Sequence, residues 1–124
     1  MQAKVNRMMH DEESWRKLQT TIAGLPDMEL ALVYETRRTA VEYAMARARW
    51  QLADIELRAE METARSLAHD CFIDAINALS RACVRHELEQ DWRRVWGTAR
   101  TGEERRRIGD FACFIAYRLM LDAR

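Results

Sequence analysis

The fold is decided by residues 26–97, which read PDMELALVYETRRTAVEYAMARARWQLADIELRAEMETARSLAHDCFIDAINALSRACVRHELEQDWRRVWG. The stretch begins with the only proline of the chain, and Gly97 is the next glycine after Gly24. Between these ends it is rich in Ala, Leu, Arg, Glu and Met, which lose little free energy on entering a helix. The sequence therefore predicts an all-α protein.

Two apolar stripes at helical spacing follow each other along this stretch. The first consists of Val41, Met45, Ala48, Leu52, Ile55 and Ala59. The second consists of Phe72, Ile76, Leu79 and Cys83, rotated by roughly 130° at about 100° per residue. One unbroken helix would be roughly 105 Å long, whereas a compact domain of this size has a radius of gyration near roughly 14 Å. We favour a break within residues 60–70, where the stripe changes phase. The alternative is a whole helix whose exposed stripe is covered by a second subunit.

Shorter helices are predicted on both sides of the central run. Residues 4–23 carry one apolar face that Gly24 ends, and Asp11 is a candidate N-cap should that helix begin later. The central pattern continues from residue 84 to Gly97. Thr101 and Glu104 form a capping box that begins a last helix.

Apart from Arg118, residues 111–121 of that last helix are apolar on all sides, which places the helix at the buried centre of a bundle or of a dimer interface. We predict a single domain, 1–124, built as a bundle of three to five helices. Its central run, about 27–97, is very long or broken once, and its C-terminal helix is buried.

Composition excludes several classes of protein. The formal net charge is zero, so no overall field attracts nucleic acid or an anionic membrane. The three cysteines are widely spaced without a C-x-x-C motif, which indicates reduced thiols in an intracellular protein. The N-terminus lacks an apolar signal region, and the longest apolar run is too short to span a bilayer. We expect a cytoplasmic protein with no membrane partner.

An acidic stripe lies along the second half of the central run. Asp70, Asp74, Asn77 and Arg81 share one helix face, with His69 beside them. The simplest interpretation is a solvated face with charge pairing one turn apart. A divalent metal or anion site is the alternative, and it requires carboxylates from a second helix. Its candidate ligands are His69, Asp70, Asp74 and Asp110.

Residues 103–111, EERRRIGDF, resemble the last metal-binding helix of all-α nucleotide pyrophosphatases of the MazG type. Those enzymes carry two E-x-x-E/D pairs on helices of a bundle. Here Arg107 stands three residues before Asp110, and Asp74 is paired with Asn77. The resemblance supports a related fold and argues against the activity.

A second candidate site is an arginine patch within residues 93–107. Trp92 and Trp96 lie beside it, and arginines with aromatic rings can grip phosphates or stacked bases. The alternative is that the arginines pair with acids elsewhere and the tryptophans are core. The patch consists of Arg93, Arg94, Arg100, Arg105, Arg106 and Arg107.

Two further pieces, His69–Arg81 and Ile108–Phe114, resemble small helical proteins of bacterial mobile elements, to which no activity is assigned. No nucleophile motif or glycine-rich phosphate loop is present, so no catalytic residue and no cofactor are predicted. The favoured function is a homo-oligomeric, regulatory or adaptor protein that acts through protein–protein contacts, with itself and with a further protein as partners. The alternatives are a nucleic-acid-binding protein that uses the arginine patch, and a degenerate pyrophosphatase-like metal protein.

Overall fold

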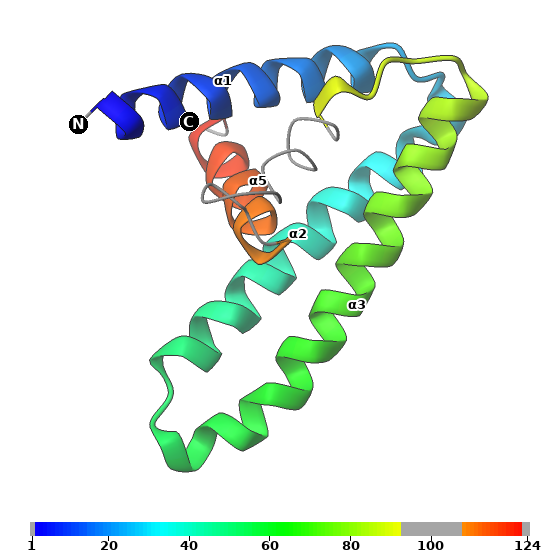
Figure 1. Cartoon of the computed structure of the whole chain (residues 1–124). Helices are drawn as coiled ribbons and strands as arrows, with labels where there is room; N and C mark the ends of the chain where they lie inside the picture. Colours follow the sequence, from blue (N-terminus) through cyan, green and yellow to red (C-terminus); the bar gives the residue numbers. More distant parts are fainter. Residues whose placement is uncertain (1, 93–107, 123–124) are drawn as a thin grey trace.

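A computed structural model describes the backbone of residues 2–92 and 108–122 and the side chains of residues 12–92 and 108–122. These residues form α1 (Gln2–Ala23), a short 3-10 helix η1 (Asp27–Glu29), α2 (Leu30–Leu52), α3 (Ile55–Arg85) and α5 (Ile108–Asp122) (Figure 1). The prediction of an all-α bundle with a long central run and a C-terminal helix is confirmed. The capping box at Thr101 and Glu104 lies outside the described residues.

Helices α2 and α3 form an antiparallel hairpin that reverses at Ala53 and Asp54 (Figure 1). Both residues adopt extended backbone, with ψ angles of 145° and 153°. The Asp54 carbonyl then accepts bonds from the amides of Leu57 (2.9 Å) and Arg58 (3.0 Å), which begins α3. The central run is therefore broken, but the predicted position within residues 60–70 is wrong. Aspartate is a favoured residue at a helix start, and here it turns the chain without glycine or proline.

Helix α3 ends at Arg85, so the prediction that the helical pattern continues from residue 84 is wrong for residues 86–90. Asp91 and Trp92 are helical again, and residues 93–97 lie outside the described residues. Glu87 adopts a left-handed backbone with a φ of 54°. The Leu88 amide donates to the Cys83 carbonyl at 2.9 Å, which closes the last turn. A left-handed residue after the last turn commonly terminates a helix, but the position usually holds glycine.

The chain after α3 folds back onto the end of α1. The Thr21 hydroxyl donates to the Glu89 carbonyl at 2.8 Å. A Cβ at Gly24 would lie 2.9 Å from a methyl group of Leu88, so glycine permits this close approach. Gly24 follows α1 as predicted, whereas α1 begins at Gln2 and not at Asp11.

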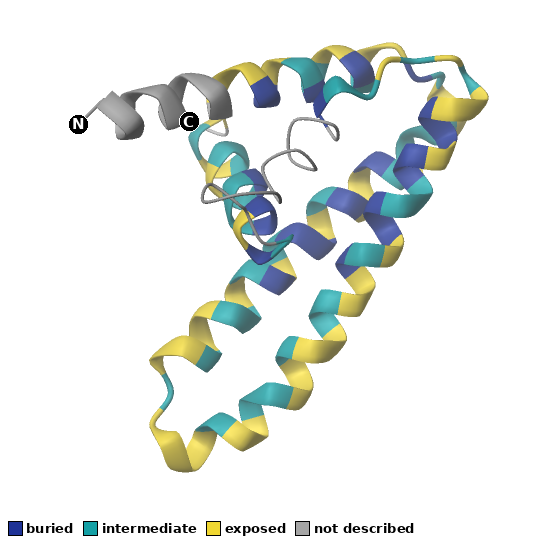
Figure 2. Ribbon diagram, viewed as in Figure 1, coloured by how far each residue is buried: buried dark blue, intermediate teal, exposed yellow. Residues whose placement is uncertain are grey.

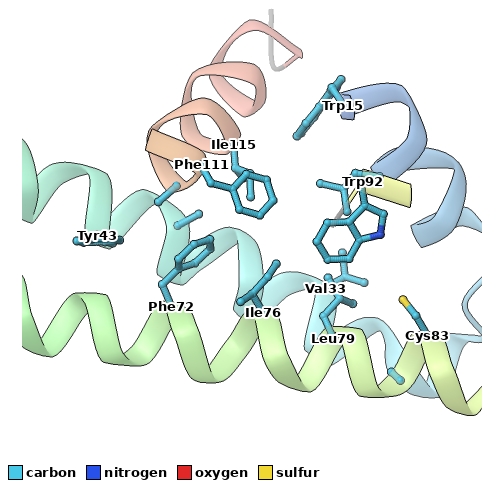
Figure 3. Close-up of a cluster of buried hydrophobic side chains, with 14 of the residues drawn as sticks. Trp15, Val33, Tyr43, Phe72, Ile76, Leu79, Cys83, Trp92, Phe111 and Ile115 are labelled. Atoms are coloured by element: carbon cyan, nitrogen blue, oxygen red, sulfur yellow. The ribbon is translucent and has the colours of Figure 1, made fainter. Parts of the chain in front are cut away.

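The core lies where α1, α5 and the chain around Trp92 cover the hairpin (Figure 3). Trp92 is fully buried, and its ring lies 6.2 Å from that of Phe111. The second predicted stripe is confirmed as core, because all four of its members are buried: Phe72, Ile76, Leu79 and Cys83.

The rest of the hairpin is an uncovered arm. No residue from 44 to 71 is buried, and Figure 2 shows exposed residues crowding towards the hairpin tip. The first predicted stripe lies mainly on this arm, and Met45, Leu52 and Ile55 of that stripe are exposed in the single chain. We refer to residues 44–71 as the arm.

Helix α5 packs through one face against α2 and joins α1 through Arg118. The Arg118 guanidinium bonds to Glu12 and lies 5.6 Å from the Trp15 ring centroid, which explains a charge within an apolar run. Phe111, Ala112 and Ile115 are buried, whereas Tyr117 and Met120 are exposed. The helix is thus buried on its inner face, and the expected burial on all sides is not reached within one chain.

In the part of the chain that the structure describes, no helix is both long enough and apolar enough to cross a membrane.

Replacing Phe72 by alanine tests the core. The ring is fully buried, so we expect Phe72→Ala to cost about 3–5 kcal/mol of unfolding free energy. Urea unfolding followed by circular dichroism measures the loss. Met28→Ala is the control, because Met28 is exposed and its loss should change stability by about 0.5 kcal/mol or less. Equal losses in both variants would contradict this core.

Glu29 generates a prediction about pH. Arg85 (3.2 Å) and His86 (3.3 Å) donate to its carboxylate and hold its pKa below the ordinary value of 4.5. A lowered pKa stabilises the fold above the unfolded pKa, and that contribution is lost as pH falls through the folded pKa. We expect Glu29→Gln to lower Tm at neutral pH.

The difference between Glu29→Gln and the wild type should shrink as pH falls below 4.5, because the wild-type carboxylate becomes protonated once pH passes below its lowered pKa. Melting curves across this range measure it. Glu60→Gln, at an exposed position on the arm, is the matched control and should give a small difference that is constant with pH. A Glu29→Gln difference no larger than that of Glu60→Gln at neutral pH would refute the proposed linkage.

Candidate functional site

The outer face of α2 carries large apolar side chains that the described part of the chain leaves largely uncovered. Tyr34 is 60% exposed, Met45 48% and Leu52 85%. Val41 is half-buried and Ala48 is exposed on the same face. We call Tyr34, Val41, Met45, Ala48 and Leu52 the outer stripe.

A cavity of about 380 Å³ lies on the other side of α2, where α2, α3 and the start of α5 meet. Its lining is mostly polar and aromatic, and no carboxylate is among the described residues that line it. The side chains that matter most for its chemistry are Tyr43, Arg47, Trp50, Arg65 and His69. We call this cavity the basic pocket.

Arg47 is held in place from outside the basic pocket. Its Nη1 donates to Asp110 at 2.8 Å and approaches the Cys113 sulfur at 3.8 Å. Burial lowers the pKa of Arg47, but the bonds from Asp110 and Cys113 raise it by more, so the guanidinium keeps its charge. A Cβ at Gly109 would lie 2.9 Å from the Arg47 Nε. Glycine at this position therefore makes room for the arginine.

Arg65 is fixed in the same manner on the α3 side. Its Nε donates to Glu62 at 3.0 Å, and its guanidinium lies 5.3 Å from the centroid of the Trp50 ring. The Tyr43 and His69 rings meet edge to face, with centroids 5.4 Å apart. Two oriented cations and an aromatic wall thus face one cavity.

The predicted metal ligands are not gathered into one site. Nδ1 of His69 lies 3.1 Å from Oδ1 of the adjacent Asp70. Asp74 is exposed one turn further along α3. Asp110 lies on α5, bonded to Arg47. Within residues 12–92 and 108–122, no group of three or more His, Cys, Asp or Glu side chains is placed to hold a metal ion.

All six arginines of the predicted patch, Arg93, Arg94, Arg100, Arg105, Arg106 and Arg107, lie outside the described residues. Trp92, which we considered as a stacking partner for bases, is instead fully buried in the core.

The three cysteines are unpaired. Burial raises the pKa of the Cys83 thiol, so this side chain stays protonated and packs as a small apolar group. Cys71 is exposed, and Cys113 is half-buried beside Arg47.

Sequence reasoning missed Tyr43, Arg47, Trp50 and Arg65. These residues come from two helices and meet only because the hairpin reverses at Ala53 and Asp54. One signal was present, since Arg47 and Trp50 stand three apart and share a helix face with Tyr43.

Comparison with protein families, curated proteins and solved structures finds no match to this chain. Functional argument therefore rests on the geometry of its own residues.

A divalent cation should leave the melting curve unchanged. A metal bound at Asp110 would have to displace Arg47, and Asp70 and Asp74 supply no third ligand nearby. Curves with and without millimolar Mg²⁺ or Mn²⁺ measure this. A bound ion would add about 2.7 kcal/mol of stability at roughly a hundred times its dissociation constant. Such a rise, abolished by Asp74→Asn, would contradict our expectation.

Proposed function

We propose that this protein is a homodimeric interaction protein whose two copies join along the outer stripe of α2. The observation that carries the proposal is the exposure of Leu52, Met45 and Tyr34 on one face of a helix. Apolar side chains gathered on one exposed face favour association. A regulatory or adaptor role without catalysis, in the cytoplasm, completes the proposal.

The spacing of the outer stripe suits a helix partner. Its members follow one another by seven, four, three and four residues, which is the repeat of a two-helix seam. At about 100° per residue, the stripe lies roughly 150° around α2 from the centre of its buried positions, which are Val33, Thr36, Thr39, Ala40 and Tyr43. The helix can therefore keep its core contacts while the outer stripe binds a second helix.

The stripe is complementary to itself when two copies of α2 run antiparallel. In one register Val41 meets the partner's Met45, and Tyr34 meets the partner's Leu52. Each contact then occurs twice about a two-fold axis, as a symmetric dimer requires. Large side chains meet across the seam at both ends of this register.

Charge on the stripe fits the same arrangement. Arg38 interrupts the apolar positions and would lie over the partner's Ala48, the smallest side chain of the stripe. Arg38 is bonded to Glu35 (3.1 Å) and Glu42 (2.7 Å) on its own helix, so its charge is compensated before association. The register also brings Glu35 near the partner's Arg49. A parallel pair would instead place the two Arg38 side chains against each other.

The proposal is tested by molar mass in solution. We expect light scattering to give about twice 14.6 kDa at micromolar concentration. Met45→Glu should give the monomer mass with an unchanged circular dichroism spectrum, because Met45 makes no core contact in the single chain. Met28→Glu, at an exposed position outside the stripe, should stay dimeric. A wild-type mass of 14.6 kDa would overturn the proposal.

A paired charge exchange tests the register. Val41→Lys and Met45→Glu should each weaken the dimer, whereas the double variant should regain it, because opposite charges then face each other twice. In a parallel pair the double variant would place like charges together and would be the weakest of the three. A dimer that Met45→Glu leaves intact would show that another surface is used.

A further inference from the structure

The basic pocket lies across α2 from the outer stripe, and the proposed dimer makes no use of it. It presents two arginines, a histidine and a tyrosine around about 380 Å³. The described residues that line this cavity bring two arginines together and include no carboxylate, which gives the cavity a local electrostatic preference for anions on a chain of zero net charge.

The arginines keep donors for a ligand. A guanidinium has five N–H donors. The bonds from Arg47 to Asp110 and Cys113 both use Nη1, and the bonds from Arg65 to Glu62 use Nε and Nη2. Arg65 also interacts with the Tyr43 hydroxyl in the same cavity. The carboxylates act from outside the cavity, so they orient the two guanidinium groups and leave other N–H groups for an anion.

The arginines are also pre-oriented, which reduces the entropy lost on binding. Gly109 lets Arg47 pack against the start of α5, and Trp50 supports the Arg65 guanidinium. Both side chains are largely buried, with 19% and 26% exposure. A surface arginine has no comparable support, and this separates the pocket from an ordinary charged face.

From these observations we infer that the basic pocket binds the phosphate group of a small phosphate ester. Arg47 and Arg65 bind the phosphate oxygens, because a guanidinium matches an oxyanion with two parallel bonds. His69 and the Tyr43 hydroxyl supply further polar contacts from the same wall. The cavity of about 380 Å³ is larger than a phosphate ion, so it has room for part of the group that carries the phosphate.

Calorimetric titration of the full chain tests the inference with three probes at matched ionic strength: inorganic phosphate, adenosine monophosphate and adenosine. We expect phosphate and the monophosphate to bind and adenosine to give no heat. Tighter binding of the monophosphate identifies an ester as the ligand, whereas equal binding identifies free phosphate. Either result supports an oxyanion site.

Arg65→Gln is the decisive variant, because Arg65 is bonded within its own helix and its replacement leaves the core intact. We expect its affinity for the monophosphate to fall roughly tenfold or more, the effect of losing a charge-assisted hydrogen bond. Arg47→Gln should lower the affinity for the monophosphate in the same way. Arg81 is an exposed arginine elsewhere on α3, so Arg81→Gln is the matched control and should leave this affinity unchanged.

The inference is overturned by any of three results: no heat from phosphate or the monophosphate at millimolar concentration, equal binding of adenosine, or unchanged affinity in Arg65→Gln. The residues of the basic pocket lie away from the outer stripe, so their variants should keep the molar mass of the wild type. A loss of phosphate binding at unchanged molar mass therefore tests the pocket alone, and a wild-type monomer mass tests the dimer alone.

Discussion

The structure depends on the position of Phe111, whose ring lies 6.1 Å from that of Phe72 and 6.2 Å from that of Trp92. These three rings come from α5, α3 and the chain beyond α3, so one cluster joins segments far apart in the sequence. Aromatic rings bury large areas and favour such tilted and edge-on contacts. The parts of α2 and α3 next to this cluster are buried. Beyond it, no residue of the arm is buried.

The limited extent of this core produces both candidate surfaces. A hairpin of two long helices needs cover along its whole length to bury both faces, and α1 and α5 cover only one end (Figure 2). The basic pocket lies at the edge of that cover, where α5 begins beside Arg47 and Gly109. The outer stripe lies on the far side of α2, where neither α3 nor α5 packs against it.

Much of the fold follows from local sequence. Helix content follows from the lack of glycine and proline between Pro26 and Gly97, and the end of α1 follows from Gly24. The sequence also predicts the core stripe on α3, because Phe72, Ile76, Leu79 and Cys83 form the main apolar face of that part of the helix. These features depend on a few adjacent residues, and a single sequence contains that information.

The two chain reversals could not be predicted in this manner. Ala53 and Asp54 turn the hairpin without a glycine or a proline, and Glu87 holds a left-handed conformation that side chains disfavour. At the second reversal long-range packing determines the backbone, since the turn at Glu87 lets Leu88 pack on Gly24. At the first reversal the bonds to the Asp54 carbonyl are local, and no turn residue marks the position in the sequence. The basic pocket depends on the first reversal, so no sequence motif marks it.

The sequence identified the first apolar stripe but not the element that covers it. An apolar face predicts that one side of a helix is buried, but it does not identify the element or chain that packs against that side. Helix α2 has core residues on one side and the outer stripe roughly opposite. The single chain supplies cover for the side that contains Val33 and Ala40, and leaves Met45 and Leu52 in solvent. An apolar face that one chain leaves exposed, and that complements its own antiparallel copy, is best explained by a second chain.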